Sequence, residues 1–247
     1  MRSLPSSERR VQRVRHEVRR REVEVVEVEP VGANFAAITF AHPSLVDFVS
    51  EAFDDHLKFI FESPAGETVM RDYTPRRFDR AGRTLTIEFA LHGHGLASDW
   101  ARQAAIGQRA TIGGPRGSMI VPADYHWHLL AGDATALPAI HRRLEELPAA
   151  TRAIVIAQVA DLADRRALAS AARLELRWVS TADELVEAVR ELVLPQGEGF
   201  AWCAGEAATM ARLREVLLVD KRHPREAARI AAYWKRGASD FHERLDA

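Results

Sequence analysis

Residues 126–159, HWHLLAGDATALPAIHRRLEELPAATRAIVIAQV, place two apolar strands around one helix. HWHLLAG and AIVIAQV are short apolar runs of strand length, whereas apolar residues recur with helical spacing over Leu137–Leu147. A strand followed by a helix and a second strand is typical of a parallel sheet with helices on both faces. The stretch therefore predicts an α/β domain.

The same alternation continues downstream. A further helix is expected after AIVIAQV, followed by the strand LELRWVS (174–180), a helix over Ala182–Leu194, the strand FAWCAG (200–205) and another helix. We predict that this α/β domain spans residues 125–247 and ends in a segment on the substrate side.

Upstream, the pattern changes to short alternating strands. EVEVVEVE (22–29) alternates acidic residues with valine, and Pro30, Gly32 and Asn34 then supply a turn. Turn residues separate the further strands expected at Phe35–Phe40, Leu57–Glu62, Val69–Thr74, Thr84–Leu91 and Arg109–Gly113. Residues 22–124 thus predict a small antiparallel β-barrel, joined to the α/β domain by a short junction near 122–126 and separated from it by a cleft.

Composition limits the class of protein. The 247 residues carry a net charge of −1 and a single cysteine, Cys203, which excludes an internal disulfide framework. The sequence has neither an apolar run of membrane-spanning length nor a secretion signal, so we expect a cytoplasmic protein without a membrane partner. The arginine-rich arm 1–21 is predicted to be a solvated helix rather than a surface for nucleic acid or an acidic protein.

Three motifs in the first half place ligand-binding groups together. In RDYTPR (71–76), alternate side chains of an extended segment share a face, which offers guanidinium, aromatic and hydroxyl groups to one ligand. In HGHGLASDWA (92–101), a helix is expected to begin with Ser98 or Asp99 near its N-cap, where backbone N–H groups suit a pyrophosphate. IGGPRGSM (112–119) is a turn in which Ser118 offers a hydroxyl.

In this order and spacing, the three motifs resemble the FAD-binding half of the siderophore-interacting protein family, part of the ferredoxin-reductase-like flavoproteins. The resemblance implies that Arg71, Tyr73, Thr74 and Arg76 line the flavin, with Tyr73 and Thr74 at its reactive part. It also implies that His92, Gly93, Gly95, Ala97 and Ser98 hold the ribityl and diphosphate groups, and Ser118 is a further cofactor contact. A solvated barrel face, a capped helix and a barrel turn are the structural alternatives.

The second half agrees with this resemblance. LLAGDATALPAI (129–140) and WCAGEAATM (202–210) resemble the family's turns for a nicotinamide nucleotide, which implies roles for Gly132, Asp133, Thr135, Ala136, Gly205 and Glu206. No GxGxxG fingerprint is present, so this assignment depends on the resemblance. Tight strand-to-helix turns are the alternative for the two glycines.

The closing motif YWKRG (233–237) resembles that of the same family. Tyr233 and Trp234 are expected to cover the flavin or wall the substrate cleft, or else to pack in the core as part of a helix. Lys235 and Arg236, together with Lys58, are expected to attract an anionic ferric chelate. The histidines lack the spacing of a metal site, so we expect iron only in the substrate.

The resemblance implies that NAD(P)H reduces a bound FAD, which then reduces Fe(III) held by a siderophore. Two alternatives stay open: a general flavin reductase or diaphorase, and a non-catalytic flavin- or nucleotide-binding module. The sequence does not decide among NADPH, NADH and ferredoxin as the electron donor, nor does it give the oligomeric state.

Overall fold

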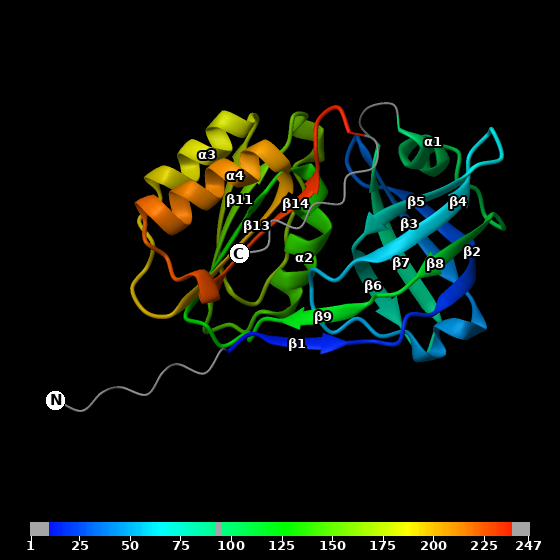
Figure 1. Cartoon of the computed structure of the whole chain (residues 1–247), viewed down its shortest axis with the longest axis horizontal. Coiled ribbons are helices and arrows are strands. Elements are labelled where there is room, and N and C mark those ends of the chain that lie inside the picture. Colours follow the sequence, from blue (N-terminus) through cyan, green and yellow to red (C-terminus); the bar gives the residue numbers. More distant parts are fainter. Residues whose placement is uncertain (1–9, 92–94, 239–247) are drawn as a thin grey trace.

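The computed structural model describes residues 10–91 and 95–238, which form two packed halves (Figure 1). One half is a curled antiparallel sheet and the other is a parallel sheet flanked by helices. The predicted fold class, a barrel-like antiparallel half followed by an α/β half, is therefore confirmed. No helix within the described residues is long and apolar enough to cross a membrane.

The antiparallel sheet has seven strands in the order β5-β4-β8-β2-β3-β7-β6. Their inward residues, such as Phe59 and Phe89, form an aromatic core with Trp100. The strand bounds are β2 (Arg20–Pro30), β3 (Phe35–Ala41), β4 (Leu57–Glu62), β5 (Thr68–Tyr73), β6 (Pro75–Asp79), β7 (Thr84–Ala90) and β8 (Arg109–Gly113). The helix α1 (Leu96–Arg102) packs against this core through Ala97 and Ala101.

Thr74 lies where the two edges of this sheet meet. The strands β5 and β6 occupy opposite edges, yet only Thr74 separates them in the chain. Among the described residues no strand pairing joins these two edges, so the sheet is an open barrel with its seam at Thr74. The RDYTPR motif thus runs across the seam.

The parallel sheet has the order β12-β11-β10-β13-β14, with the central strand β10 (Trp127–Gly132) paired on both sides. The helix α2 (Leu137–Glu146) packs on one face, while α3 (Ala182–Glu191) and α4 (Ala207–Glu215) pack on the other. The remaining strands are β11 (Arg152–Gln158), β12 (Arg173–Val179), β13 (Gly199–Glu206) and β14 (Ala228–Trp234). Because the strands are parallel, their carboxyl ends share one edge.

Three local predictions were wrong. Between β11 and β12 the chain forms only a 3-10 turn, Leu162–Asp164, because Asp161 caps it and Asp164 binds the backbone of Asn34 in the other half. Tyr233 and Trp234 of the closing motif do not belong to a helix, the alternative weighed for them, but end β14, which pairs with β13; Lys235, Arg236 and Gly237 follow the strand. The helix α1 begins after Gly95, and the Ser98 hydroxyl donates to the Ala90 carbonyl instead of capping the helix.

The arginine-rich arm is also not a helix where the structure describes it. Residues Gln12–Arg15 form β1, which pairs antiparallel with β9 (Gly117–Ile120) and runs along both halves (Figure 1). Arg10 lies over the Tyr125 ring and forms ion pairs with Asp124 and Glu198. Long-range pairing with β9 and these contacts, which no local pattern reveals, favour the strand.

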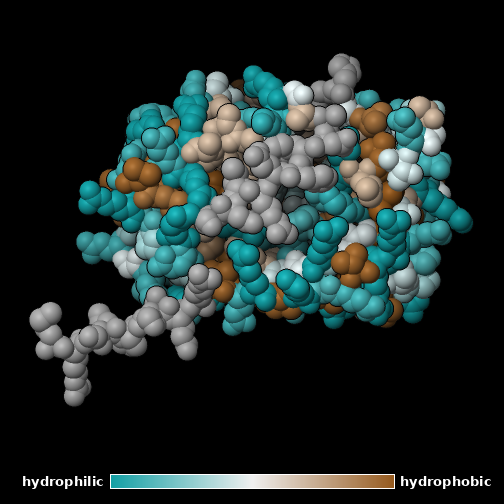
Figure 2. Space-filling model, in the orientation of Figure 1, coloured by the Kyte–Doolittle hydropathy of each residue, from teal (hydrophilic) through white to brown (hydrophobic). Residues whose placement is uncertain are grey.

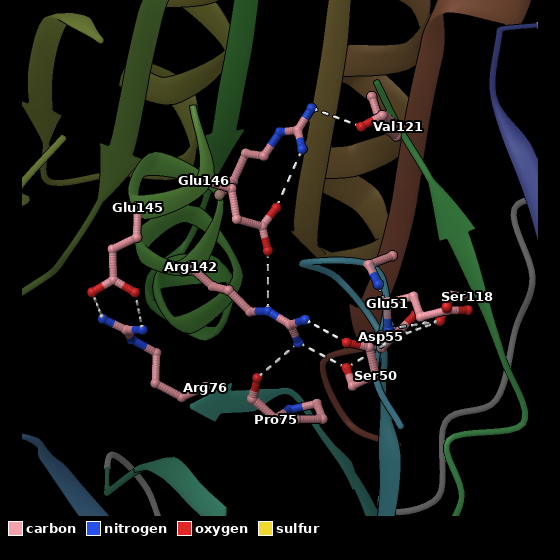
Figure 3. A network of polar contacts seen from close by, with 12 residues as sticks. Ser50, Glu51, Asp55, Pro75, Arg76, Ser118, Val121, Arg142, Glu145 and Glu146 are labelled. Atoms are coloured by element: carbon pink, nitrogen blue, oxygen red, sulfur yellow. Dashed lines mark hydrogen bonds and ion pairs between the residues drawn. The ribbon is translucent and has the colours of Figure 1, made fainter. Parts of the chain in front are cut away.

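Arginines of α2 connect the two halves (Figure 3). Arg142 donates to the Ser50 hydroxyl at 2.8 Å, the Ser50 carbonyl at 2.9 Å and the Pro75 carbonyl at 3.1 Å. Arg143 donates to the carbonyls of Val121 and Pro122. Both arginines are buried, so these charge-assisted bonds fix α2 against the flavin-side strands.

Candidate functional site

The aromatic and hydroxyl groups of RDYTPR lie at the seam. Tyr73 ends β5, and its ring packs at 4.4 Å between centroids from Phe89, so burial raises the pKa of its hydroxyl. Thr74 is buried at the bend. Arg71, two residues before Tyr73 on β5, donates to the Met70 carbonyl at 2.8 Å. The structure thus brings these three predicted residues together.

Arg76, the fourth predicted residue of the motif, is engaged in ion pairs. Its guanidinium donates to both carboxylate oxygens of Glu145 on α2, at 2.7 and 2.9 Å (Figure 3). Glu88 on β7 lies 3.3 Å from its Nε and also accepts from Arg166. Arg76 lowers the pKa of Glu145 through this hydrogen bond. The guanidinium therefore ties the flavin-side strand to the α/β half.

The turn before α1 supplies free backbone donors. Gly95 is the N-cap in an extended conformation with no side-chain cap, and Ala97 and Ser98 lie in the first helical turn. N–H groups of a first turn have no intrahelical acceptor. His92 and Gly93 lie outside the described residues.

Ser118 occupies a buried polar network. Its hydroxyl donates to Asp55 at 2.6 Å, accepts from the Glu51 backbone N–H at 3.1 Å and lies 2.8 Å from His16 Nε2 (Figure 3 shows the first two contacts). A hydroxyl has one donor and two acceptor positions, and these three contacts occupy all of them. Burial raises the pKa of Asp55, which the hydrogen bond from Ser118 opposes. The side chain fastens β9 to the segment before β4.

The predicted nicotinamide-side residues meet at the carboxyl edge of the parallel sheet. Gly132 ends β10, where a Cβ would lie 2.3 Å from the Ala204 carbonyl, so only glycine fits. The Asp133 carboxylate accepts from the Thr135 backbone N–H at 2.9 Å and the Thr135 hydroxyl at 2.5 Å. Ala136 is fully buried beside Gly132.

The same carboxylate joins two further strand ends. Its Oδ2 accepts from the Glu206 backbone N–H and from Trp234 Nε1, each at 2.8 Å. Gly205 has a φ of +152°, and a Cβ there would lie 2.5 Å from this oxygen. Glu206 in turn caps α4 by accepting from the N–H groups of Ala208 and Thr209. Asp133 therefore organises the ends of β10, β13 and β14.

Tyr233 connects this edge to the flavin motif. Its hydroxyl faces the side chain of Thr74, and burial raises the pKa of that hydroxyl. Its ring makes an edge-to-face contact with Trp202. Trp202 donates to Asp54 at 2.9 Å, and Asp54 also pairs with Arg229 at 2.5 Å. The sequence did not single out Asp54, because an acid next to another acid in an irregular segment carries no periodic signal.

The three predicted substrate cations differ in setting. Lys235 and Arg236 are exposed just after β14, and the Arg236 N–H donates to Glu206 at 3.4 Å. Lys58 lies on β4 and pairs with Asp72 at 2.8 Å. Within residues 10–91 and 95–238, no group of three or more His, Cys, Asp or Glu side chains could hold a metal ion.

The groups at the seam fit an FAD. One bent segment supplies an aromatic ring, a hydroxyl and a guanidinium, and α1 packs next to it, because Trp100 and Tyr73 both contact Phe59 and Phe89. These are the stacking, hydrogen-bonding and anion-binding groups that a flavin dinucleotide requires. Arg71, Tyr73, Thr74 and the α1 turn would hold it.

Comparison with known proteins identifies both halves. The family described as Siderophore-interacting protein matches residues 125–237, and the Siderophore-interacting FAD-binding domain matches residues 63–119. The NADPH-dependent ferric-chelate reductase of Escherichia coli is 33% identical over 245 residues, covering 90% of this chain and 96% of that protein. The ferric vibriobactin reductase ViuB of Vibrio cholerae is 28% identical, covering 86% of this chain and 89% of that protein.

Solved structures agree with the sequence relatives. A siderophore utilization protein from T. fusca superposes with a TM-score of 0.88 at 31% identity, covering 94% of this chain and 99% of that one. A ferredoxin reductase of carbazole 1,9a-dioxygenase, at 16% identity and a TM-score of 0.69, shares the fold alone. The chain carries an FAD-binding domain in a ferredoxin-reductase-like fold, and it belongs to the siderophore-interacting protein family.

Proposed function

We propose that this chain is an FAD-containing, NADPH-dependent reductase of ferric siderophores and related ferric chelates, which releases iron as Fe(II) in the cytoplasm. One observation carries the proposal: β14, an edge strand of the parallel sheet, carries Tyr233, its penultimate residue, next to Thr74 of the flavin motif. The names of the Escherichia coli and Vibrio cholerae relatives support the same reaction. In this proposal the flavin domain spans residues 22–124 and the nicotinamide domain residues 125–247.

A bound flavin accepts a hydride as two electrons and can pass them on singly, which matches a nicotinamide donor to Fe(III). Tyr73 would pack against the flavin, and the Thr74 hydroxyl would lie at its reactive edge. Tyr233 would lie beside that hydroxyl and limit its access to solvent. Arg71 and the first turn of α1 would bind the diphosphate.

The carboxyl edge of the parallel sheet would receive NADPH. Gly132 and Gly205 let the backbone approach closely at two strand ends, and Asp133 holds those ends in place. A ligand at this edge would lie next to Thr74, because β14 carries Tyr233 there. We assign Thr135 and Glu206 to the walls of this nucleotide site, and the buried Ala136 to the packing beneath Gly132.

The substrate would approach the seam from the side of Lys58, Lys235 and Arg236. Siderophores bind Fe(III) through hard oxygen donors, and Fe(II) is a softer ion, so reduction weakens the complex. Exposed cations attract anionic chelates and raise their association rate. The cytoplasm is the compartment that supplies the reduced nicotinamide donor.

Steady-state turnover with different acceptors and donors tests this proposal. Ferric siderophores should be reduced with a higher kcat/KM than free FMN or quinones, and NADPH should be a better donor than NADH or reduced ferredoxin. Equal rates with all acceptors would instead identify a general diaphorase.

A further inference from the structure

The strand β12 forms one edge of the parallel sheet. It pairs with β11 on one side, and within residues 10–91 and 95–238 no strand pairs with its other side. At its two ends, the Arg173 N–H donates to the Thr151 carbonyl and the Val179 carbonyl accepts from the Val159 N–H, so these odd-numbered positions direct their backbone groups toward β11. The direction alternates along a strand. Three even-numbered residues therefore present their N–H and carbonyl groups to the outside: Leu174, Leu176 and Trp178.

The side chains of β12 divide into an apolar row and a charged row. Leu174 and Trp178 pack against the core on the α2 side of the sheet, and Leu176 between them is exposed. On the opposite side, Glu175 and Arg177 are half exposed and lie beside α3. The edge thus combines free backbone groups with an apolar and a charged row, which are the features that another strand can bind.

The order of these residues is self-complementary in one antiparallel register. When two copies of β12 pair about Leu176, Leu174 of each chain lies opposite Trp178 of the other. Glu175 of each chain lies opposite Arg177 of the other. The outward backbone groups then meet as hydrogen-bonded pairs, and the opposite charges occupy the non-hydrogen-bonded positions, where side chains come closer together.

Charge and backbone direction exclude the neighbouring registers. A shift by two residues places either Glu175 or Arg177 opposite its own copy, and like charges directly opposite each other are destabilising. A shift by one residue sets the outward backbone groups of one copy against inward groups of the other. Within each chain Glu175 pairs with Arg152, and Arg177 pairs with Glu191, so the favoured register joins these ion pairs into one alternating network.

We propose that β12 binds a second copy of this chain, with the two strands antiparallel about a two-fold axis at Leu176. The two five-stranded sheets then become one continuous sheet, and both free edges are used up, so the assembly closes as a dimer. The two copies of β12 run in opposite directions, so the two nucleotide edges lie on opposite sides of the joined sheet and stay open. This dimer does not depend on the proposed reductase function.

Sedimentation velocity of full-length charge variants tests the pairing, with circular dichroism to check that each variant folds. Glu175→Arg and Arg177→Glu should each raise the dimer dissociation constant by about 10-fold or more, because each sets like charges opposite each other twice. An equimolar mixture of the two variants pairs a positive strand with a negative strand, so it should dimerise within about 3-fold of wild type. Glu24→Arg is the control and should change nothing: Glu24 is 48% exposed, against 51% for Glu175, and lies near Arg109 in the antiparallel sheet.

A cysteine at the two-fold axis tests the register independently. Leu176→Cys places two thiols opposite each other with their Cα atoms about 5.5 Å apart, which is disulfide distance. Mild oxidation should convert most of this variant to a covalent dimer. Arg173→Cys should stay monomeric on a denaturing gel, because its two copies would lie roughly 20 Å apart along the strands. The native Cys203 is buried and does not compete.

Several results would overturn the proposal. They are a wild-type protein that stays monomeric at every concentration, single charge variants that dimerise like wild type, a mixture of the two that does not recover, and equal cross-linking of the two cysteine variants.

Discussion

Substitution of Asp133 tests the candidate site, because its carboxylate joins the ends of three strands. This carboxylate is buried and accepts four hydrogen bonds, two from Thr135 and one each from Glu206 and Trp234. Asp133→Ala leaves the Glu206 N–H and the Trp234 indole N–H without their acceptor. Each buried donor left unpaired costs about 1–3 kcal/mol, so the loss of the acceptor for these two donors should lower the free energy of unfolding by about 2–6 kcal/mol.

A double-mutant cycle isolates one of these bonds. Trp234→Phe removes the indole donor and should cost about 1–2 kcal/mol alone, since the bond is made to a carboxylate. In the Asp133→Ala background the same change should cost almost nothing, which gives a coupling energy of about 1–2 kcal/mol. Urea unfolding of the four proteins measures it.

The function should follow the same pattern. Because Asp133 holds the ends of β10, β13 and β14, Asp133→Ala should raise the KM for NADPH by about 10-fold or more. Asp183→Ala is the matched control: its carboxylate pairs with Arg212 on the surface, so the loss should stay below about 0.5 kcal/mol. A loss below about 1 kcal/mol in Asp133→Ala, or a coupling energy near zero, would refute the reasoning.

Three further predictions, made with four substitutions, test the packing of the two halves. Burial and, to a lesser extent, Arg143 lower the pKa of His128 to about 3, and a contact with the Ala123 backbone acts in the opposite direction. The neutral, buried His128 therefore contributes its full stability above the ordinary histidine pKa of about 6.5, and this contribution is lost as the pH falls toward 3. Between pH 7.5 and 5, wild type should therefore lose about 2 kcal/mol more than His128→Phe in urea titrations, and parallel pH profiles would contradict this. Gly199→Ala should lower the free energy of unfolding by about 3 kcal/mol or abolish folding, because the new Cβ would lie 1.8 Å from the Trp127 ring. Gly113→Ala is the control: the atom nearest to its new Cβ would be 3.7 Å away, so the urea midpoint should be nearly unchanged. Arg76 lowers the pKa of Glu145, so that pair stabilises above pH of about 4.5 and weakens as the pH falls further; Glu145→Gln should cost about 1 kcal/mol at pH 7 and less at pH 4, and an equal cost at both pH values would exclude the ion pair as the cause.

The sequence predicted the elements whose patterns are local. The bounds of β4 and β8 match the predicted strands, and α2 and α3 begin at the predicted residues, because apolar spacing and turn residues define these elements. The strands β1, β6, β9 and β14 were not predicted, since each is short or depends on a partner far away in the chain. The outer surface in Figure 2 is mainly hydrophilic, with hydrophobic residues in separate small patches.

The sequence pointed to individual residues of the candidate site but not to the contacts between them. The sequence singled out Asp133, Glu206 and Trp234 separately, yet nothing in it indicated that one carboxylate joins all three. The contact of Tyr233 with Thr74 depends on the position of β14 at the edge of the parallel sheet. The pairing of Arg76 with Glu145 likewise depends on how α2 packs against β6. Such contacts follow from tertiary packing, which a local pattern does not contain.

The most direct test of the proposed function is an anaerobic absorbance titration of the purified protein with a ferrous trap present. We expect a yellow protein whose flavin absorbance is bleached by NADPH and returns on addition of a ferric siderophore, together with one Fe(II)–trap complex for each electron delivered. Reoxidation without Fe(II) formation, or a colourless protein that takes up no added FAD, would contradict the account.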